Sequence, residues 1–201
     1  CYMEWIVDRY YNELVNYMKN NEQFLKAVGV LDFIKSTQVG ERNIQTGDID
    51  NDGENEIIFV RHDVLNQDYV IIMIIDKIDN KFKIIEKKIN KGYDGYIKLL
   101  DVTNDIQPEI LFFMSQGRDG YLLYIYQYLK NKELREIFKS EFSLFPDYVF
   151  SDSNQNGLME IKMKGKIKDT VKDYQIYIEK VYEYNKTKND FIKIEDVENE
   201  I

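Results

Sequence analysis

The segment Gly47-Asp48-Ile49-Asp50-Asn51-Asp52-Gly53-Glu54-Asn55-Glu56-Ile57 has acidic side chains at positions 48, 50, 52 and 56. Carboxylates spaced this closely repel one another unless a cation lies between them, and Ca²⁺ accepts six to eight oxygen ligands from a curled loop. Gly53 permits the sharp turn that such a loop needs, because glycine adopts positive φ without steric cost. We therefore predict a Ca²⁺ site with ligands from the side chains of Asp48, Asp50, Asp52 and Glu56 and from the backbone carbonyl of Glu54.

Two other interpretations of this segment were considered. An EF-hand needs a bidentate acid at loop position twelve and a helix on each side. Position twelve is Phe59, inside the strand-like run Ile57-Ile58-Phe59-Val60, so an EF-hand is excluded. A solvated acidic turn between two strands stays open, because Asp, Asn and Gly are ordinary turn residues.

The acidic segment recurs twice along the chain. The second copy is Asp101-Val102-Thr103-Asn104-Asp105-Ile106-Gln107-Pro108-Glu109-Ile110, and the third is Asp152-Ser153-Asn154-Gln155-Asn156-Gly157-Leu158-Met159-Glu160-Ile161. In each copy an acid at the first position is followed eight residues later by glutamate and then isoleucine. Because the copies lie 53 and then 51 residues apart, the sequence predicts a structural repeat of about 52 residues.

Each repeat has room for four strands. From alternation and turn residues we expect strands at 42–49, 55–61, 69–76, 81–89, 96–102, 108–114, 120–129, 133–140, 146–151, 158–166, 173–184 and 190–195. Four-stranded units recurring at about 50 residues are typical of β-propeller blades. The predicted fold is therefore mainly β, with about three propeller-like blades at approximately 40–92, 93–143 and 144–196 inside a domain of residues 37–201.

An N-terminal α-helical segment is expected before this domain, over residues 1–36. Its apolar residues, including Trp5, Ile6, Tyr10 and Leu14, follow helical spacing. Such helices could cover an exposed sheet face or edge, which would otherwise invite aggregation.

Composition excludes several functional classes. The net charge of −9 argues against a nucleic-acid partner, which requires a basic surface. No stretch approaches the 18 apolar residues of a membrane span. The one cysteine, Cys1, cannot form an internal disulfide. Its position resembles the lipidated cysteine of a mature bacterial lipoprotein, which would imply a lipid anchor; the alternative is a boundary that happens to fall there.

The pattern Asp-x-Asp-x-Asp-Gly-x-x-Glu-Ile at residues 48–57 resembles the calcium loop of FG-GAP/VCBS repeats, the blade units of integrin-alpha-type propellers and of many bacterial surface proteins. The resemblance covers roughly residues 40–196. It implies that the loop joins the first two strands of a blade and holds Ca²⁺. Three repeats are fewer than the four to eight blades of a closed propeller, so an open arrangement is expected.

The other two copies depart from this pattern. The second has Thr103 in place of an acid and Ile106 in place of the glycine, so we expect it to hold no ion. The third keeps Gly157 but has fewer charges, and lower ligand charge weakens Ca²⁺ affinity. A weaker second site would use Asp152, Asn154, Asn156, Leu158 and Glu160.

The sequence offers no catalytic constellation. His62 is read as a turn residue, and no nucleophile elbow, phosphate loop or zinc spacing occurs. Tyr124, Tyr126 and Tyr128 share one face of a strand, where they would either stack on sugars, contact a protein partner or pack between sheets.

These observations favour a non-enzymatic, extracytoplasmic binding or structural module whose repeat loop is stabilised by Ca²⁺, with an unidentified protein or glycan ligand. Two alternatives stay open. One is a hydrolase of polysaccharide or peptide that uses a carboxylate pair, because the chain has 36 acidic residues and nothing selects among them. The other is a metal-free β-rich interaction domain.

Overall fold

The computed structural model describes residues 44–62, 69–78, 81–90, 94–115, 120–140, 143–169 and 174–200. These residues form twelve β-strands and no helix. No helix in this part of the chain is long and apolar enough to cross a membrane. The helical segment expected at residues 1–36 lies outside the described residues.

The strands form three four-stranded antiparallel units. The first sheet contains β1 (Ile44–Gly47), β2 (Glu56–His62), β3 (Tyr69–Ile78) and β4 (Lys81–Asn90). The second contains β5 (Asp94–Leu100), β6 (Glu109–Ser115), β7 (Gly120–Tyr128) and β8 (Leu134–Lys139). The third contains β9 (Ser143–Ser151), β10 (Glu160–Asp169), β11 (Tyr174–Asn185) and β12 (Asp190–Glu200). Each predicted strand is present within a few residues of its expected bounds, so the mainly β prediction is confirmed.

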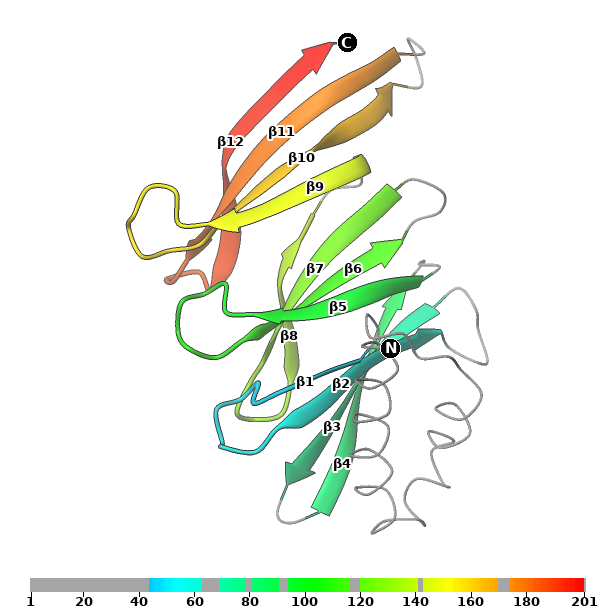
Figure 1. The fold of residues 1–201 in the computed structure, drawn as a ribbon, viewed down its shortest axis with the longest axis vertical. Coiled ribbons are helices and arrows are strands. Elements are labelled where there is room, and N and C mark those ends of the chain that lie inside the picture. The colour runs from blue at the N-terminus through cyan, green and yellow to red at the C-terminus, as the bar shows by residue number, and fades with distance from the viewer. Residues whose placement is uncertain are drawn as a thin grey trace, which may run out of the picture.

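The three sheets follow one another along the long axis of the molecule (Figure 1). The second and third are joined by a short antiparallel contact in which Gly120 pairs with Leu144 and Tyr121 with Ser143. Figure 1 places the β1–β2, β5–β6 and β9–β10 connections on the same side of the molecule. We call these the first loop (residues 48–55), the second loop (101–108) and the third loop (152–159).

Strand β6 of the second sheet contributes to two cores, since the side chains of a strand point alternately to opposite sides. On β6, Ile110 and Phe112 belong to the core shared with the first sheet, whereas Leu111 and Phe113 belong to the core shared with the third. This double burial explains the continuous apolar run of β6, since both faces must be hydrophobic.

The row Tyr124, Tyr126 and Tyr128 on β7 lies in the core between the first and second sheets. The three residues are 4%, 1% and 0% exposed. The rings of Tyr124 and Tyr126 are stacked with their centroids 6.0 Å apart. The packing interpretation of this row is therefore confirmed, and its alternative as a surface for sugar or protein is wrong.

Side chains of the second loop connect all three loops. The amide nitrogen of Gln107 donates to the backbone carbonyls of Ile49, at 2.5 Å, and of Tyr128, at 2.6 Å. The amide nitrogen of Asn104 donates to the carbonyl of Gly157 at 2.8 Å. The loops are thus held in contact by hydrogen bonds at one edge of the stacked sheets.

Candidate metal centre in the first loop

The glutamate that begins the strand after each loop has the same role in all three. A carboxylate oxygen of Glu56 accepts a hydrogen bond from the backbone nitrogen of Ile49 at 2.8 Å. The corresponding bonds run from Val102 to Glu109, at 2.9 Å, and from Ser153 to Glu160, at 2.8 Å. This glutamate therefore closes each loop by a hydrogen bond that itself needs no ion.

The first aspartate of each loop also shapes the backbone. Asp48 accepts hydrogen bonds from the backbone nitrogens of Asp52, at 3.1 Å, and Gly53, at 2.9 Å. Asp101 accepts the equivalent pair at 3.2 and 2.8 Å, and Asp152 at 3.0 and 2.9 Å. The acids that recur in the sequence are accordingly explained by hydrogen bonding, so an ion site must rest on positions where the loops differ.

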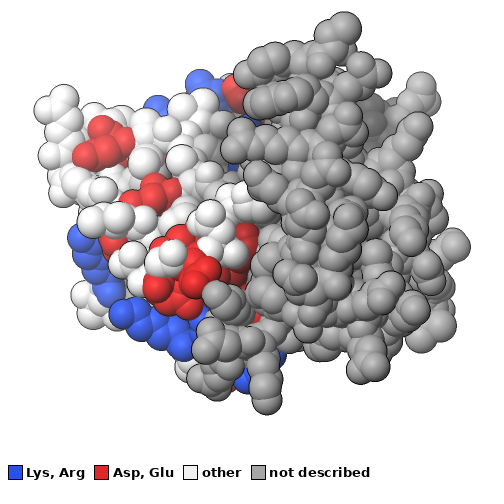
Figure 2. Space-filling model, turned by 60° about the horizontal axis from the view of Figure 1, so that its bottom comes forward, with Lys and Arg blue, Asp and Glu red and all other residues white. Residues whose placement is uncertain are grey.

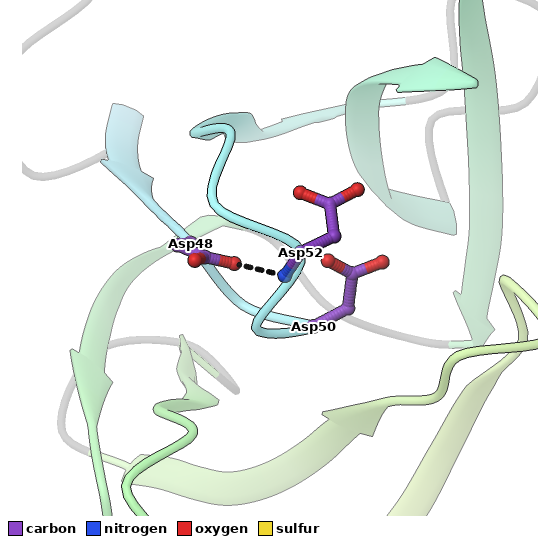
Figure 3. Close-up of side chains that lie close together, drawn as sticks. All are labelled: Asp48, Asp50 and Asp52. Carbon is purple, nitrogen blue, oxygen red and sulfur yellow. Dashed lines mark hydrogen bonds between the residues drawn. The ribbon is translucent and has the colours of Figure 1, made fainter. Parts of the chain in front are cut away.

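Those positions are Asp50 and Asp52, which are both acidic only in the first loop. Figure 3 shows their carboxylates side by side, while Asp48 reaches across the loop to the backbone nitrogen of Asp52. One carboxylate oxygen from each of Asp48, Asp50 and Asp52 lies within 4.8 Å of the other two. One ion could therefore contact all three residues.

A further acid, Asp76 on β3, completes the cluster. Because Ile57 pairs with Ile75 in the antiparallel register, Glu56 and Asp76 are the next pair along the two strands. Carboxylate oxygens of Asp52, Glu56 and Asp76 also lie within 4.8 Å of one another. Like charges directly opposite on a sheet are destabilising, so this pair requires a proton or a cation.

Burial makes the requirement stronger. Asp50, Glu56 and Asp76 are 2%, 0% and 0% exposed, and each has one carboxylate oxygen that is buried without a hydrogen-bond partner. A buried, unsatisfied oxygen of this kind costs roughly 1–3 kcal/mol, and more when it is charged. Burial raises the pKa of Glu56 to about 8; the hydrogen bond from Ile49 opposes this rise, and the charges of Asp50, Asp76 and Asp52 add to it.

One cation of the protein itself enters the cluster. Lys132, in the turn between β7 and β8, places its ammonium nitrogen in hydrogen-bond contact with Asp50, 2.9 Å from Asp76 and 3.6 Å from Asp52. The hydroxyl of Tyr128 donates to Asp76 at 2.7 Å. Burial by itself lowers the pKa of Lys132, but hydrogen bonds to Asp50 and Asp76 outweigh it and raise the pKa above its ordinary value.

The second loop has no comparable excess of charge. Its glutamate, Glu109, accepts hydrogen bonds from the Thr103 hydroxyl at 3.0 Å and from the Gln127 amide at 3.4 Å. Gln127 stands opposite Glu109 as Asp76 stands opposite Glu56, because Ile110 pairs with Tyr126. Two neutral side chains thus donate hydrogen bonds to Glu109, whereas two acids, Asp50 and Asp76, surround the corresponding Glu56.

The third loop is intermediate. Glu160 pairs directly with Glu183 across the sheet, and Glu160 keeps one buried oxygen without a partner. Both Asn154 and Asn156 direct their amide nitrogens at Glu183, at 2.9 and 2.8 Å. The weaker site predicted here stays a prediction, and the two groups of three acids that could hold an ion among the described residues both include Asp52 of the first loop.

Solvent reaches one side of the first-loop cluster. Asp52 is 38% exposed and Lys132 23% exposed, and Asp48 is partly exposed, whereas Asp50, Glu56 and Asp76 are buried. Figure 2 shows acidic side chains gathered in patches on one face of the molecule, with lysine and arginine side chains in a band beside the largest patch. An ion could therefore enter past Asp52 and Lys132.

Sequence reasoning identified part of this cluster. The predicted ligands Asp48, Asp50, Asp52 and Glu56 are brought together by the fold. The backbone nitrogen of the fifth predicted residue, Glu54, donates to Asp52 at 2.9 Å. The role of the Glu54 carbonyl stays a prediction. Two members of the cluster were not predicted. Asp76 could have been indicated by the register of β2 and β3, and Lys132 comes from a distant turn. The side chain of His62 lies outside the described residues.

Comparisons of the chain with protein-family models, with curated proteins and with solved structures gave no match.

Proposed function

We propose that this protein is a non-enzymatic binding or structural module in which a divalent cation, Ca²⁺, binds to the first loop and ties it to β3. The observation that carries the proposal is the set of three buried carboxylate oxygens, on Asp50, Glu56 and Asp76, that have no hydrogen-bond partner. A hard cation such as Ca²⁺ prefers oxygen ligands and would replace the missing partners.

The donor set supports Ca²⁺ over transition metals. All the candidate ligands are oxygen atoms, from carboxylates and the Glu54 carbonyl, whereas zinc and copper sites in proteins favour imidazole and thiolate. The ligands come from the loop and from two adjacent strands, so an ion there would clamp backbone segments rather than activate a substrate. We extend the proposal to an open, propeller-like stack in an extracytoplasmic setting, where Ca²⁺ sites with dissociation constants of about 10⁻⁴ to 10⁻³ M can be filled.

The test is a thermal melt in EDTA, in Mg²⁺ and in Ca²⁺ from micromolar to millimolar concentration. A ligand that binds only the folded state stabilises it by RT ln(1 + [L]/Kd), about 2.7 kcal/mol at 100 Kd. We expect a Ca²⁺-dependent rise in melting temperature for the unmodified protein and its loss in Asp76→Asn. A curve that is flat in Ca²⁺ would refute the site and favour a metal-free interaction domain.

A matched pair of variants separates the loss of an ion ligand from a change in loop shape. Asp52 and Asp105 occupy the same loop position and accept the same backbone hydrogen bond, at 2.9 and 3.0 Å. Asparagine can make this bond, as Asn156 does in the third loop at 2.8 Å. Asp52→Asn should therefore weaken the response to Ca²⁺, whereas Asp105→Asn should leave it unchanged.

A further inference from the structure

We propose that the ammonium group of Lys132 and a divalent cation compete for the same carboxylates, so that ion binding releases the β7–β8 turn from the first sheet. This inference rests on the proposed cation site and adds a regulatory element to it. The turn belongs to the second sheet and the carboxylates to the first, so the competition acts on the junction between two sheets.

The geometry makes the two cations mutually exclusive. The Lys132 nitrogen contacts Asp50 and lies 2.9 Å from Asp76 and 3.6 Å from Asp52. Ca²⁺ binds oxygen ligands at about 2.3–2.6 Å. An ion held by these three side chains would occupy the space of the ammonium group, and the two positive charges would repel each other. The lysine must leave for the ion to bind.

The backbone of the turn has a conformation at Lys132 that few residues other than glycine adopt. Lys132 has a φ of 67°, in the left-handed region that favours glycine and asparagine. Its backbone nitrogen donates to Leu129 at 2.7 Å, and the nitrogen of Leu129 donates to Glu133 at 2.9 Å, which closes the turn. At this position the ammonium group of Lys132 contacts Asp50 and Asp76.

The next junction, between the second and third sheets, provides an internal control. There Thr103 replaces Asp50, Gln127 replaces Asp76, and the turn residue that corresponds to Lys132 is Asn189, with a φ of 54°. Asn189 accepts a hydrogen bond from the hydroxyl of Tyr184, the residue that corresponds to Tyr128. Of the two turns, the one facing the acids has lysine at the position with positive φ, whereas the other, which also contains Lys186 and Lys188, has asparagine there. This difference supports Lys132 as the cation of the acidic cluster.

Lys132 does not provide a partner for every buried carboxylate oxygen of the cluster. With Lys132 in place, Asp50, Glu56 and Asp76 still each retain an unpartnered buried oxygen. A divalent ion carries twice the charge and can contact several of these oxygens at once. The flexible side chain of Lys132 is partly exposed, so it can move into solvent without a change in the fold of either sheet.

The experiment is calorimetric titration of the full chain with Ca²⁺, comparing the unmodified protein with Lys132→Met and Lys130→Met. Methionine keeps an unbranched side chain of similar length but has no charge. We expect Lys132→Met to bind Ca²⁺ about tenfold more tightly, because the ion no longer displaces a bound ammonium group. Lys130 is exposed in the same turn, so Lys130→Met controls for the general loss of one positive charge.

Amide hydrogen exchange of the β7–β8 turn supplies a second readout. Ca²⁺ should speed exchange at residues 129–133 in the unmodified protein and leave it unchanged in Lys132→Met, where the turn is already released. If methionine prevents folding, Lys132→Asn tests the same point with the residue that occupies the equivalent position 189.

The outcomes separate the two proposals. Ca²⁺ binding that is equal in the unmodified protein and Lys132→Met, or weaker in the variant, overturns the competition and leaves the cation site standing. Absence of Ca²⁺ binding in both proteins overturns the proposed function and the competition together. Tighter binding in Lys132→Met but not in Lys130→Met, with faster exchange in the turn, supports the inference.

Discussion

The first and second loops share a pattern of backbone hydrogen bonds but differ in the charge of the side chains around their buried glutamate. In both, an aspartate at the first position and a glutamate at the ninth accept the same backbone hydrogen bonds. In the second loop Thr103 and Gln127 then satisfy the buried glutamate, so the loop is complete by itself. At the first loop, Asp50 and Asp76 of β3 instead surround the corresponding glutamate, Glu56, with more negative charge. The comparison teaches that loop shape and ion binding depend on different residues.

The largest expected effect is that of removing the loop glutamate. Glu109→Ala leaves the backbone nitrogens of Val102 and Thr103 and the Thr103 hydroxyl without their acceptor. We expect a loss of roughly 4 kcal/mol in the free energy of unfolding, measured with urea and equal in EDTA and in Ca²⁺.

Glu56→Ala provides the contrast. It removes one hydrogen-bond acceptor, that of the Ile49 backbone nitrogen, and it also relieves repulsion among acids. Its loss in EDTA should be smaller than that of Glu109→Ala, and its loss in Ca²⁺ larger than in EDTA. Equal losses for both variants under both conditions would mean that the two loops do not differ as described.

The next effect comes from converting the first loop into the second. A triple variant with Asp50→Thr, Asp76→Gln and Lys132→Asn reproduces the residues found at the next junction. We expect it to fold in EDTA at least as stably as the unmodified protein. It should lose the Ca²⁺ response, which is worth about 2.7 kcal/mol at 100 Kd. A triple variant that still responds to Ca²⁺ would place the ion elsewhere.

The second loop should contribute a pH effect of its own. Burial raises the pKa of Glu109 from 4.5 to about 7, against hydrogen bonds from Val102 and Thr103 that lower it. Because the folded protein then holds the proton more tightly than the unfolded chain, this group stabilises the fold at low pH. That contribution is lost as the pH rises through about 7.

Chemical unfolding at several pH values measures this contribution. Between pH 5 and pH 8 the unmodified protein should lose about 2 kcal/mol relative to Glu109→Gln, which does not titrate. Parallel stability curves for the two proteins would show that the Glu109 carboxyl titrates normally.

The smallest effect concerns the sixth position of each loop, where φ is positive. Gly53 has a φ of 90°, whereas Ile106 has a φ of 77° and is 86% exposed. A β-branched residue is strained there, so Ile106→Gly should raise stability by about 0.5–1 kcal/mol. Gly53→Ala should lower it by a similar amount, because nothing lies within 4 Å of the added carbon and only the backbone is affected. Thermal melts in EDTA measure both changes.

The sequence was sufficient for the strands because their alternation, turns and recurring loop are local patterns. The continuous apolar runs of β3 and β6 are local patterns too, and such runs are typical of strands buried on both faces. The first and ninth loop positions were recognisable as well, although their shared role as hydrogen-bond acceptors was visible only from the backbone geometry.

The rest of the site depends on long-range contacts. Asp76 joins the cluster through the register of β2 and β3, which a run of residues does not reveal by itself. Lys132 is 82 residues from Asp50 and reaches it only because the second sheet stacks on the first. A three-acid pattern can be read from one segment, whereas its counter-cation depends on how separate units pack.

The two amide side chains of the second loop have a consequence for the length of the array. Gln107 binds the first loop and Asn104 the third, and β6 has an apolar face for each neighbouring sheet. The second sheet and its loop therefore make hydrogen bonds and apolar contacts with a neighbouring sheet on each side. A longer array would be obtained by duplicating this unit, since the first and third units have Glu54 and Leu158 where Gln107 lies.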